Sequence, residues 1–270
     1  MVKPAMAREL PMKLAVYQAL VTDGNIAGAL ARLRGALVAS AAAGARMLVA
    51  PELLLPGYNR PDLHATTAQG RDGPWMSTLR DMVREAGCGL TLGWAERAGG
   101  QIYNAATAIG ADGAILAHYR KIQLFGPMER ESFTAGDAAP LVFDLEGRRA
   151  GLLICYDIEF PGHAAGLAGA GADLVLVPTA NPAGYEHVQE LLVPTRAYEN
   201  RLCVAYANYC GQEAGLGFGG RSLIAGPDGR PLATAGTTET LLIAELPAAD
   251  TFPPDRLSTQ DRDYRRPDGK

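Results

Sequence analysis

The sequence predicts an α/β protein in which two β-sheets pack together and helices cover their outer faces. Short apolar runs of strand length alternate along the chain with longer stretches of helical periodicity. Hydrophobic residues make up 48% of the 270 residues, which is enough for a large core. Each half of the chain also places an apolar strand before a prominent polar residue and then a helix. This loose similarity of the halves favours two sheets of similar construction.

No low-complexity linker divides the chain. Its length suits one large α/β domain, so we expect a single domain over residues 1–270. The segment from about residue 250 onward is polar and rich in proline. We therefore expect a C-terminal tail that leaves the body of the domain.

The predicted helices follow from composition and periodicity. Residues 25–45 are rich in Ala and Leu, with apolar residues recurring three and four apart. Residues 75–87 form an amphipathic pattern that Gly87 closes. Further helices are expected at 163–170 and, despite Pro194, at 187–201.

The predicted strands are apolar runs separated by turn residues. The pairs Gly99-Gly100 and Asp112-Gly113 favour hairpins, and so does the Pro-Asp-Gly turn inside 219–236. The stretch 123–137 is polar and is expected to be irregular. Strands are predicted at 13–20, 45–52, 88–97, 101–110, 114–121, 141–147, 148–157, 172–180, 202–209 and 240–247, with a hairpin over 219–236.

Composition and pattern exclude several kinds of partner. A net charge of −4 gives no basic footprint, so we do not expect a nucleic acid partner. The N-terminus lacks the pattern of a signal peptide, and no apolar run is long enough to cross a membrane, so a cytoplasmic protein is expected. The four cysteines form no CxxC pair, which predicts reduced thiols. No spacing of His, Cys, Asp or Glu suggests a metal site.

Cys155 is the first candidate for chemistry. It follows the apolar run GLLI, after which the chain turns through residues 157–161 into a helix. A nucleophile on a sharp strand-to-helix turn is exposed above the sheet, and the next backbone N–H can face a developing oxyanion. The alternative is a buried structural cysteine. A thiol nucleophile needs a base or a positive neighbour, and none of the four histidines lies at a suggestive strand end.

Two charged residues also end apolar strands. Glu52 follows the run MLVAP, and a carboxylate buried there must be paired or functional. Partial burial would raise its pKa and suit it to act as a general base. Lys121 ends the run AILAHYR, where its ammonium could pair with Glu52 or stabilise an oxyanion. Glu129 could supply a second carboxylate. Taken singly, each of these could be an ordinary surface charge.

Taken together, these segments resemble the nitrilase superfamily of carbon–nitrogen hydrolases. That family has a Glu, a Lys and a Cys in this order and at similar spacings, here in APELLLPGYN, YRKIQLFG and LLICYDIEFP. The resemblance covers residues 13–247. It implies a four-layer α-β-β-α sandwich, a homodimer or higher homo-oligomer, and a role for the C-terminal tail as an arm between subunits.

The resemblance also implies a mechanism and a set of site residues. Glu52 would take the proton of Cys155, whose thiolate would attack the carbonyl carbon of a small amide. Lys121 and the N–H of Tyr156 would stabilise the oxyanion. Glu52 would protonate the leaving ammonia and then activate the water that hydrolyses the thioester. No cofactor or metal is implied.

Three further residues are assigned through the same resemblance. Glu129 matches the auxiliary carboxylate of the amidase branches, and would position the substrate or the water. Tyr58 and Asn181 are expected to contact the substrate. Two places depart from the pattern: Gln123 stands where many relatives have His, and Gly162-His163 after Pro161 stands where relatives often have Glu. Both departures are expected to affect substrate choice.

Within the family, the motifs ICYDIEFP, VPTAN and AYENR are most similar to aliphatic amidases of the 5-aminopentanamidase type. An amide with a terminal amine would need an acidic group or a cluster of carbonyls deep in the pocket, and Asp157, Glu186 and Glu190 are candidates for the acidic group. Each also has an ordinary structural explanation, Asp157 as a helix-start cap and the two glutamates as a solvated face.

Other functions stay open. Within the family these are an R-stereoselective amidase and a hydrolase of N-carbamoyl amines or amino acids, while a nitrilase fits the cysteine motif less well. Two alternatives belong to a different class of protein: a catalytically silent scaffold and a redox-sensing cysteine protein. The redox sensor would need an exposed resolving cysteine.

Overall fold

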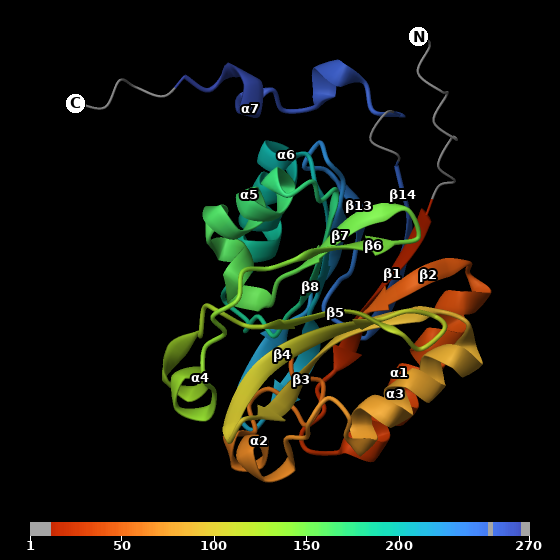
Figure 1. Cartoon of the computed structure of the whole chain (residues 1–270), viewed down its shortest axis with the longest axis vertical. Coiled ribbons are helices and arrows are strands. Elements are labelled where there is room, and N and C mark those ends of the chain that lie inside the picture. The colour runs from red at the N-terminus through yellow and green to blue at the C-terminus, as the bar shows by residue number, and fades with distance from the viewer. Residues whose placement is uncertain (1–11, 248–250, 266–270) are drawn as a thin grey trace.

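The computed structural model describes residues 12–247 and 251–265, and it contains two β-sheets packed face to face between two layers of helices (Figure 1). This arrangement confirms the predicted four-layer α-β-β-α sandwich.

The first sheet has eight strands in the order β11-β10-β1-β2-β3-β4-β5, with β14 pairing antiparallel to β1. Strands β1, β2 and β3 run parallel, whereas β3, β4 and β5 form successive antiparallel hairpins. The hairpins agree with the prediction from the Gly-Gly and Asp-Gly turns. The strands are β1 (Met12–Leu20), β2 (Ala45–Val49), β3 (Gly89–Ala98), β4 (Gln101–Ile109), β5 (Ile115–Arg120), β10 (Tyr209–Glu213), β11 (Leu216–Gly219) and β14 (Thr240–Leu246).

The second sheet has six strands in the order β13-β12-β9-β8-β7-β6. Its centre is parallel, through β7, β8 and β9, and hairpins close both edges. The strands are β6 (Val142–Leu145), β7 (Arg148–Leu152), β8 (Leu174–Pro178), β9 (Cys203–Ala207), β12 (Leu223–Ala225) and β13 (Pro231–Thr234).

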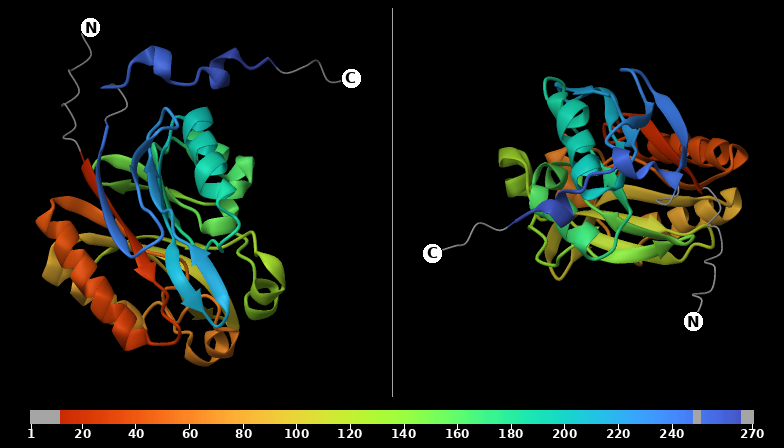
Figure 2. Two further views of the ribbon diagram at one scale, coloured as in Figure 1. Left: turned by 180° about the vertical axis from the view of Figure 1, so that it is seen from behind. Right: turned by 90° about the horizontal axis from the view of Figure 1, so that it is seen from above.

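Each sheet carries two helices on its outer face (Figure 2). The first is covered by α1 (Ile26–Ala42) and α3 (Pro74–Ala86), and the second by α5 (Pro161–Gly169) and α6 (Val193–Asn200). A π-helical turn over Val188–Leu192 precedes α6. Pro194 stands in the first turn of α6, directly after this π-helical turn.

Side-chain alternation explains the layers. Along β8, Leu174 and Leu176 point into the core between the sheets, whereas Val175 and Val177 point toward the helices. In β1, Leu14 likewise belongs to the core between the sheets. Successive side chains of a strand face opposite sides, so a central strand with apolar residues at every position serves two cores.

Two strands are shorter than predicted at the ends next to Glu52 and Cys155. The strand expected over 45–52 ends at Val49, and that expected over 148–157 ends at Leu152. Pro51 has no N–H for a sheet ladder, and Cys155 has a φ of +45°, which lies far from the φ range of a regular strand. The residues beyond these strand ends form loops, and these loops build the site.

A third difference lies at residues 202–209, where the sequence predicts one strand. The chain instead leaves the second sheet after Ala207 and enters the first at Tyr209. Asn208 fixes this change of sheet, because its side chain donates to the carbonyls of Asn181 and Gly220. The β10–β11 hairpin that follows is not among the predicted elements. Its residues alternate too weakly in polarity to indicate a strand pair.

Two short helices are also absent from the prediction, α2 (Pro61–Thr67) and α4 (Gly126–Ser132). The second lies inside the stretch 123–137 that the sequence predicts to be irregular. Both have a proline in the first turn, where its fixed φ favours helix initiation. Their short length hides the periodicity that identifies longer helices.

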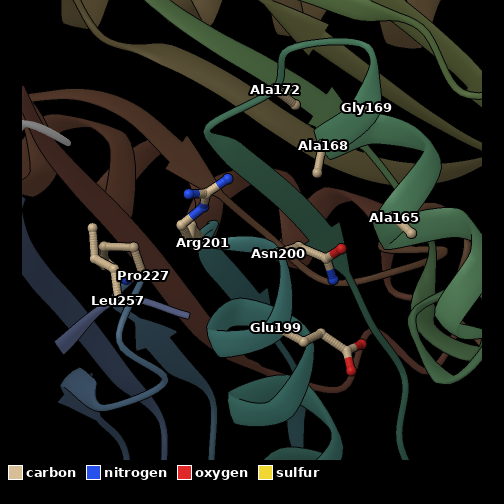
Figure 3. A pocket seen from close by; sticks show the side chains of 9 residues that line it. All are labelled: Ala165, Ala168, Gly169, Ala172, Glu199, Asn200, Arg201, Pro227 and Leu257. Atoms are coloured by element: carbon tan, nitrogen blue, oxygen red, sulfur yellow. The ribbon is translucent and has the colours of Figure 1, made fainter. Parts of the chain in front are cut away.

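The described part of the tail does not simply leave the domain. Residues 251–265 cross one end of the sandwich and include α7 (Gln260–Asp263) (Figure 1). Ser258 is buried, and Leu257 helps to line a cavity of about 590 Å³ beside α5 and α6 (Figure 3). The cavity shares no lining residue with the predicted site. Its lining residues are Ala165, Ala168, Gly169, Ala172, Glu199, Asn200, Arg201, Pro227 and Leu257.

Candidate active site

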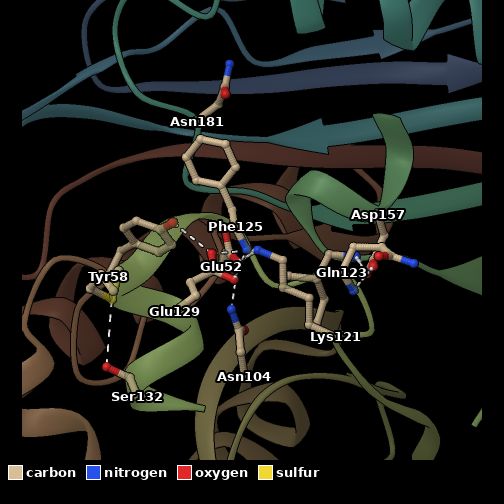
Figure 4. A network of polar contacts seen from close by, with 12 residues as sticks. Glu52, Tyr58, Asn104, Lys121, Gln123, Phe125, Glu129, Ser132, Asp157 and Asn181 are labelled. Atoms are coloured by element: carbon tan, nitrogen blue, oxygen red, sulfur yellow. Dashed lines mark hydrogen bonds and ion pairs between the residues drawn. The ribbon is translucent and has the colours of Figure 1, made fainter. Parts of the chain in front are cut away.

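The three predicted charged residues meet in one buried cluster. Lys121 Nζ lies 2.7 Å from Oε1 of Glu52 and 2.7 Å from Oε1 of Glu129 (Figure 4). All three side chains are fully buried. Glu52 comes from the loop after β2, Lys121 directly follows β5, and Glu129 lies on α4. Two carboxylates held by one ammonium inside a protein are costly unless they are well paired, so these three residues are not ordinary surface charges.

Cys155 lies beside this cluster and comes from the other sheet. It opens a 3-10 turn over Cys155–Glu159 that follows β7, and it is 7% exposed. Its φ of +45° is a strained conformation for a side chain other than glycine. Leu53, next to Glu52, has a φ of +46°. Such strain is concentrated at functional sites, where the surrounding structure enforces it.

Backbone contacts hold the two halves of the site together. The N–H of Glu52 donates to the carbonyl of Thr179, which follows β8 of the second sheet. The carboxylate of Asp157 accepts hydrogen bonds from the N–H of Ile154 and the N–H of Gln123. The glutamate and the cysteine are therefore fixed relative to each other across the sandwich.

Burial determines the proton affinities of the cluster. It raises the pKa of Glu52 to about 7, and the Glu129 charge adds to this while the Lys121 ammonium opposes it. Burial and the nearby Glu52 charge hold the pKa of the Cys155 thiol well above its usual range. Burial alone would lower the pKa of Lys121, but the two carboxylates outweigh it and keep that pKa well above its usual range. Near neutral pH the site therefore holds a thiol, an ammonium and a carboxylate poised to take up a proton.

The remaining predicted residues also lie at this site. Tyr58 donates its hydroxyl to Glu129 Oε1 at 2.7 Å, so its polar group faces the auxiliary carboxylate. Asn181 donates its amide to the carbonyl of Tyr185 and to Oε1 of Gln189, which uses both of its N–H groups within the protein. Tyr156 directly follows Cys155 and is half-buried. The roles of these residues toward a substrate stay predictions.

The sequence reasoning missed Asn104. This residue of β4 donates its amide to Glu52 Oε1 at 2.7 Å, and its backbone carbonyl accepts the N–H of Lys121 at 2.8 Å. A signal is present in the sequence, because Asn104 is an amide within the apolar run YNAATAI. A buried amide on a strand needs partners, and here one of them is a catalytic candidate.

The two departures from the family pattern contact each other. Gln123 Nε2 lies 3.2 Å from Nε2 of His163. The backbone N–H of Gln123 donates to Asp157, so this pair adjoins the turn that carries Cys155. Their proximity means that a change at one position bears directly on the other.

Aromatic side chains gather next to the cluster. Phe125 packs edge-on against Tyr156 and Tyr185, with ring centroids 5.2 and 5.8 Å apart, and Tyr156 packs in the same way against Phe160 at 4.9 Å. Phe125 lies above Glu52 in Figure 4, and its backbone N–H donates to Glu129. These rings give the polar site an apolar border.

Within the described residues we find no group of three or more His, Cys, Asp or Glu side chains arranged to hold a metal ion. The same residues include no helix long and apolar enough to cross a membrane.

Comparison with known proteins agrees with the geometry. Residues 13–252 match the carbon-nitrogen hydrolase family. A hydrolase encoded in the pqqF 5′ region of Pseudomonas protegens is 45% identical over 87% of this chain and 82% of its own length. An (R)-stereoselective amidase from a Pseudomonas species is 36% identical over 94% of this chain and 89% of its own.

Solved structures of the amidase from Nesterenkonia sp. AN1 are similar to the whole sandwich. One shows acrylamide added to the active site cysteine; it has a TM-score of 0.84 and 35% identity over 87% of this chain and 93% of its own. A mutant in complex with butyramide has a TM-score of 0.85 and 35% identity over 90% of this chain and 94% of its own. The chain therefore belongs to the carbon-nitrogen hydrolase family, that is, the nitrilase superfamily that its motifs resemble.

Proposed function

We propose that this protein is an amidase that hydrolyses the C–N bond of a small linear amide to a carboxylic acid and ammonia, through a thioester on Cys155. The observation that carries the proposal is the fully buried Lys121 between Glu52 and Glu129, beside a cysteine held at positive φ. The amidases among the similar proteins support the same chemistry.

The first half-reaction forms the thioester. The Glu52 carboxylate takes the proton of the Cys155 thiol while the sulfur attacks the amide carbon. The oxyanion that develops is stabilised by the Lys121 ammonium and by the N–H of Tyr156 at the start of the turn. Protonated Glu52 then gives its proton to the leaving nitrogen. The C–N bond breaks and ammonia departs.

The second half-reaction releases the acid. Glu52, again a carboxylate, removes a proton from a water molecule that attacks the thioester carbon. The C–S bond breaks, and the sulfur recovers its proton from Glu52. Glu129 keeps Lys121 and Tyr58 in place and so shapes the space for the substrate and the water. One water is consumed for each ammonia released, and no cofactor takes part in this scheme.

The surroundings of Cys155 also bear on the size and polarity of the acyl group. The aromatic border beside Cys155 favours an aliphatic acyl chain, and the Nesterenkonia amidase mutant was crystallised with butyramide. A 5-aminopentanamide-like substrate would also need a partner for its terminal ammonium. The three acids that the sequence suggests already have partners: Asp157 has two N–H groups and a tyrosine, Glu186 has the N–H of Gly184, and Glu190 has Arg221.

Glu159 is the better partner for such an amine. It lies in the turn that begins with Cys155 and is half-buried, and its carboxylate makes no hydrogen bond or ion pair among the contacts of the described residues. Burial raises its pKa, and the charges of His187, Lys121 and Arg196 act on it in the opposite direction. If the substrate carries an amine, Glu159→Gln should lower kcat/KM for 5-aminopentanamide about tenfold and leave that for pentanamide unchanged. Equal effects on both substrates would remove Glu159 from this role.

The experiment that tests the function is ammonia release from a panel of small amides. The panel holds butyramide, propionamide, 5-aminopentanamide, glutamine, a pair of enantiomeric amino-acid amides, an N-carbamoyl amino acid and one nitrile. Cys155→Ala should abolish the release, whereas Cys88→Ala, which removes another buried free thiol, should not. Ammonia release that survives in the Cys155 variant would overturn the mechanism.

The same panel separates the alternatives. A strong preference for one enantiomer would assign the R-stereoselective branch, which the 36% identical relative represents. Carbon dioxide released together with ammonia would assign a carbamoylase. A folded protein that releases no ammonia from any compound would favour a silent scaffold. A redox sensor would need a resolving cysteine, and all four cysteines of this chain are buried.

We also propose a cytoplasmic homodimer or higher homo-oligomer. The free cysteines fit a reducing compartment, and the tail over α5 and α6 leaves a cavity at that end of the molecule. Light scattering of the full-length protein and of a chain ending at residue 247 tests both the oligomer and the part that the tail plays in it. A monomer for the full chain would overturn this proposal.

A further inference from the structure

The two oxygens of the Glu52 carboxylate have very different surroundings. Oε1 accepts one hydrogen bond from Lys121 Nζ and one from the Asn104 amide, both at 2.7 Å. Oε2 is buried and has no hydrogen-bond partner among the residues that the structure describes. A buried carboxylate oxygen without a donor is costly, so its retention calls for an explanation.

Asn104 contacts the catalytic candidates in two separable ways. Its side chain reaches Glu52, whereas its backbone carbonyl accepts the N–H of Lys121. The amide orientation is fixed by this arrangement, because the opposite orientation would place Oδ1 against the carboxylate. Asn104 is 1% exposed and lies within β4, so its position is set by the sheet. A substitution of the side chain leaves the backbone contact to Lys121 in place.

We propose that Asn104 is a positioning residue: together with Lys121 it holds Glu52 through Oε1, and so leaves Oε2 as the oxygen that exchanges protons with Cys155 and the leaving nitrogen. This inference rests on the proposed function, since it assumes that Glu52 is the base. It adds a positioning side chain to Glu52, Lys121, Glu129 and Cys155.

The charge balance explains why an amide suits this position. Lys121 already divides its ammonium between Glu52 and Glu129. A second cation would hold Glu52 ionised too firmly for it to act as an acid later in the cycle. A neutral N–H donor stabilises the carboxylate more weakly, and orients it at the same time. The Asn104 hydrogen bond lowers the pKa of Glu52 against the larger effect of burial, which raises it.

The test is the pH dependence of two reactions in Asn104→Leu, which keeps the volume of the side chain and removes the donor. The acidic limb of kcat/KM for amide hydrolysis should move to higher pH by about one pH unit, and kcat should fall about tenfold or more. The rate of alkylation of Cys155 by iodoacetamide should show the same displacement of its acidic limb. The second reaction needs no substrate, so it tests this inference even if no amide is hydrolysed.

Thr107→Val is the matched control. Thr107 is buried on the same strand, but its hydroxyl bonds to Trp94 and His118 instead of Glu52. This variant should lose stability without shifting the acidic limb of kcat/KM or that of Cys155 alkylation. Asn104→Ala, a smaller change, should behave like Asn104→Leu and serves if the leucine variant does not fold. The proposal would be overturned if the acidic limbs of an Asn104 variant stayed at the wild-type pH. It would also be overturned if Thr107→Val moved them by as much as the Asn104 variants do.

Discussion

The carboxylate of Asp157 accepts the backbone N–H of Gln123 at 2.9 Å, and this contact joins the turn that carries Cys155 to the segment that follows Lys121. The same carboxylate accepts the N–H of Ile154 and the hydroxyl of Tyr119. The cysteine and the lysine come from different sheets, so their separation depends on contacts of this kind.

Asp157→Asn is therefore expected to lower kcat about tenfold and the free energy of unfolding by about 1–2 kcal/mol, because an amide cannot accept all three donors. Steady-state kinetics and urea denaturation measure the two effects. Tyr119→Phe removes only one of the donors and is expected to have a smaller effect on kcat. An Asp157→Asn enzyme with wild-type kcat would show that other contacts set the position of Cys155.

The pKa of Glu52 sets the expected pH dependence of the reaction. Burial raises this pKa to about 7, and the mechanism needs the carboxylate at the first step. Below pH 7 the fraction of ionised Glu52 falls, so kcat/KM is expected to fall about tenfold for each further pH unit. A pH profile of ammonia release measures this.

Glu52→Gln tests the same role of Glu52 as a base. Its carbonyl oxygen can still accept from Lys121, so the protein should remain folded by circular dichroism while the activity is lost at every pH. A profile that stays flat down to pH 5 in the wild type would argue against Glu52 as the base.

Gly93 of β3 is expected to be essential for the position of Glu52. A Cβ atom on Gly93 would lie 2.5 Å from the Cα of Glu52 and 2.5 Å from the N of Leu53, which is closer than atoms can pack. Gly93→Ala should push the loop outward, with a loss of about 1–3 kcal/mol in stability and a much larger loss of activity. Thermal unfolding and the ammonia assay give the two numbers.

Gly35→Ala provides the matched control for that substitution. Gly35 lies within α1, and a Cβ atom added there would have no atom of the described residues within 4 Å beyond its own helix backbone and chain neighbours. Alanine should stabilise the helix there by about 0.5–1 kcal/mol and leave the activity as it is. Equal activity in both glycine variants would mean that the Glu52 loop adapts to the added methyl group.

Glu96 is expected to stabilise the first sheet in a pH-dependent way. It is 1% exposed and bonds to Nε2 of His118 and to Nε of Arg120. Burial raises its pKa, but these two partners outweigh burial and lower it from 4.5 to about 2. Its stabilising contribution is complete above about pH 4.5 and is lost as the pH falls toward 2.

Glu96→Gln should thus cost about 2 kcal/mol at pH 7 and clearly less at pH 3. Urea denaturation at the two pH values checks this, and a cost that does not depend on pH would contradict it. The catalytic cluster does not include Glu96, so the activity of the folded variant should match that of the wild type.

Much of the fold can be predicted because its signals are local. The helix α1 follows from an Ala- and Leu-rich run, and the hairpins of β3, β4 and β5 follow from their turn residues. The ends of strands are less predictable. Cys155 looks like the end of an apolar strand, yet a positive φ places it in a turn. At Asn208 the chain changes sheets inside a continuous apolar run, and only contacts with Asn181 and Gly220 reveal this.

The residue types at the ends of the apolar strands can be read from the chain alone: a glutamate, a lysine and a cysteine in the order of a carbon–nitrogen hydrolase. This is possible because the apolar pattern of each strand and each family motif involve residues that are neighbours in the sequence. The packing of the sandwich, in contrast, is what puts Lys121 between two carboxylates, joins Asn104 to them, and leaves one oxygen of Glu52 without a donor among the described residues. The contacts of Lys121 with Glu129 and Glu52 join residues 8 and 69 positions apart. Their energies depend on burial, which is a property of the packed sandwich and not of any segment.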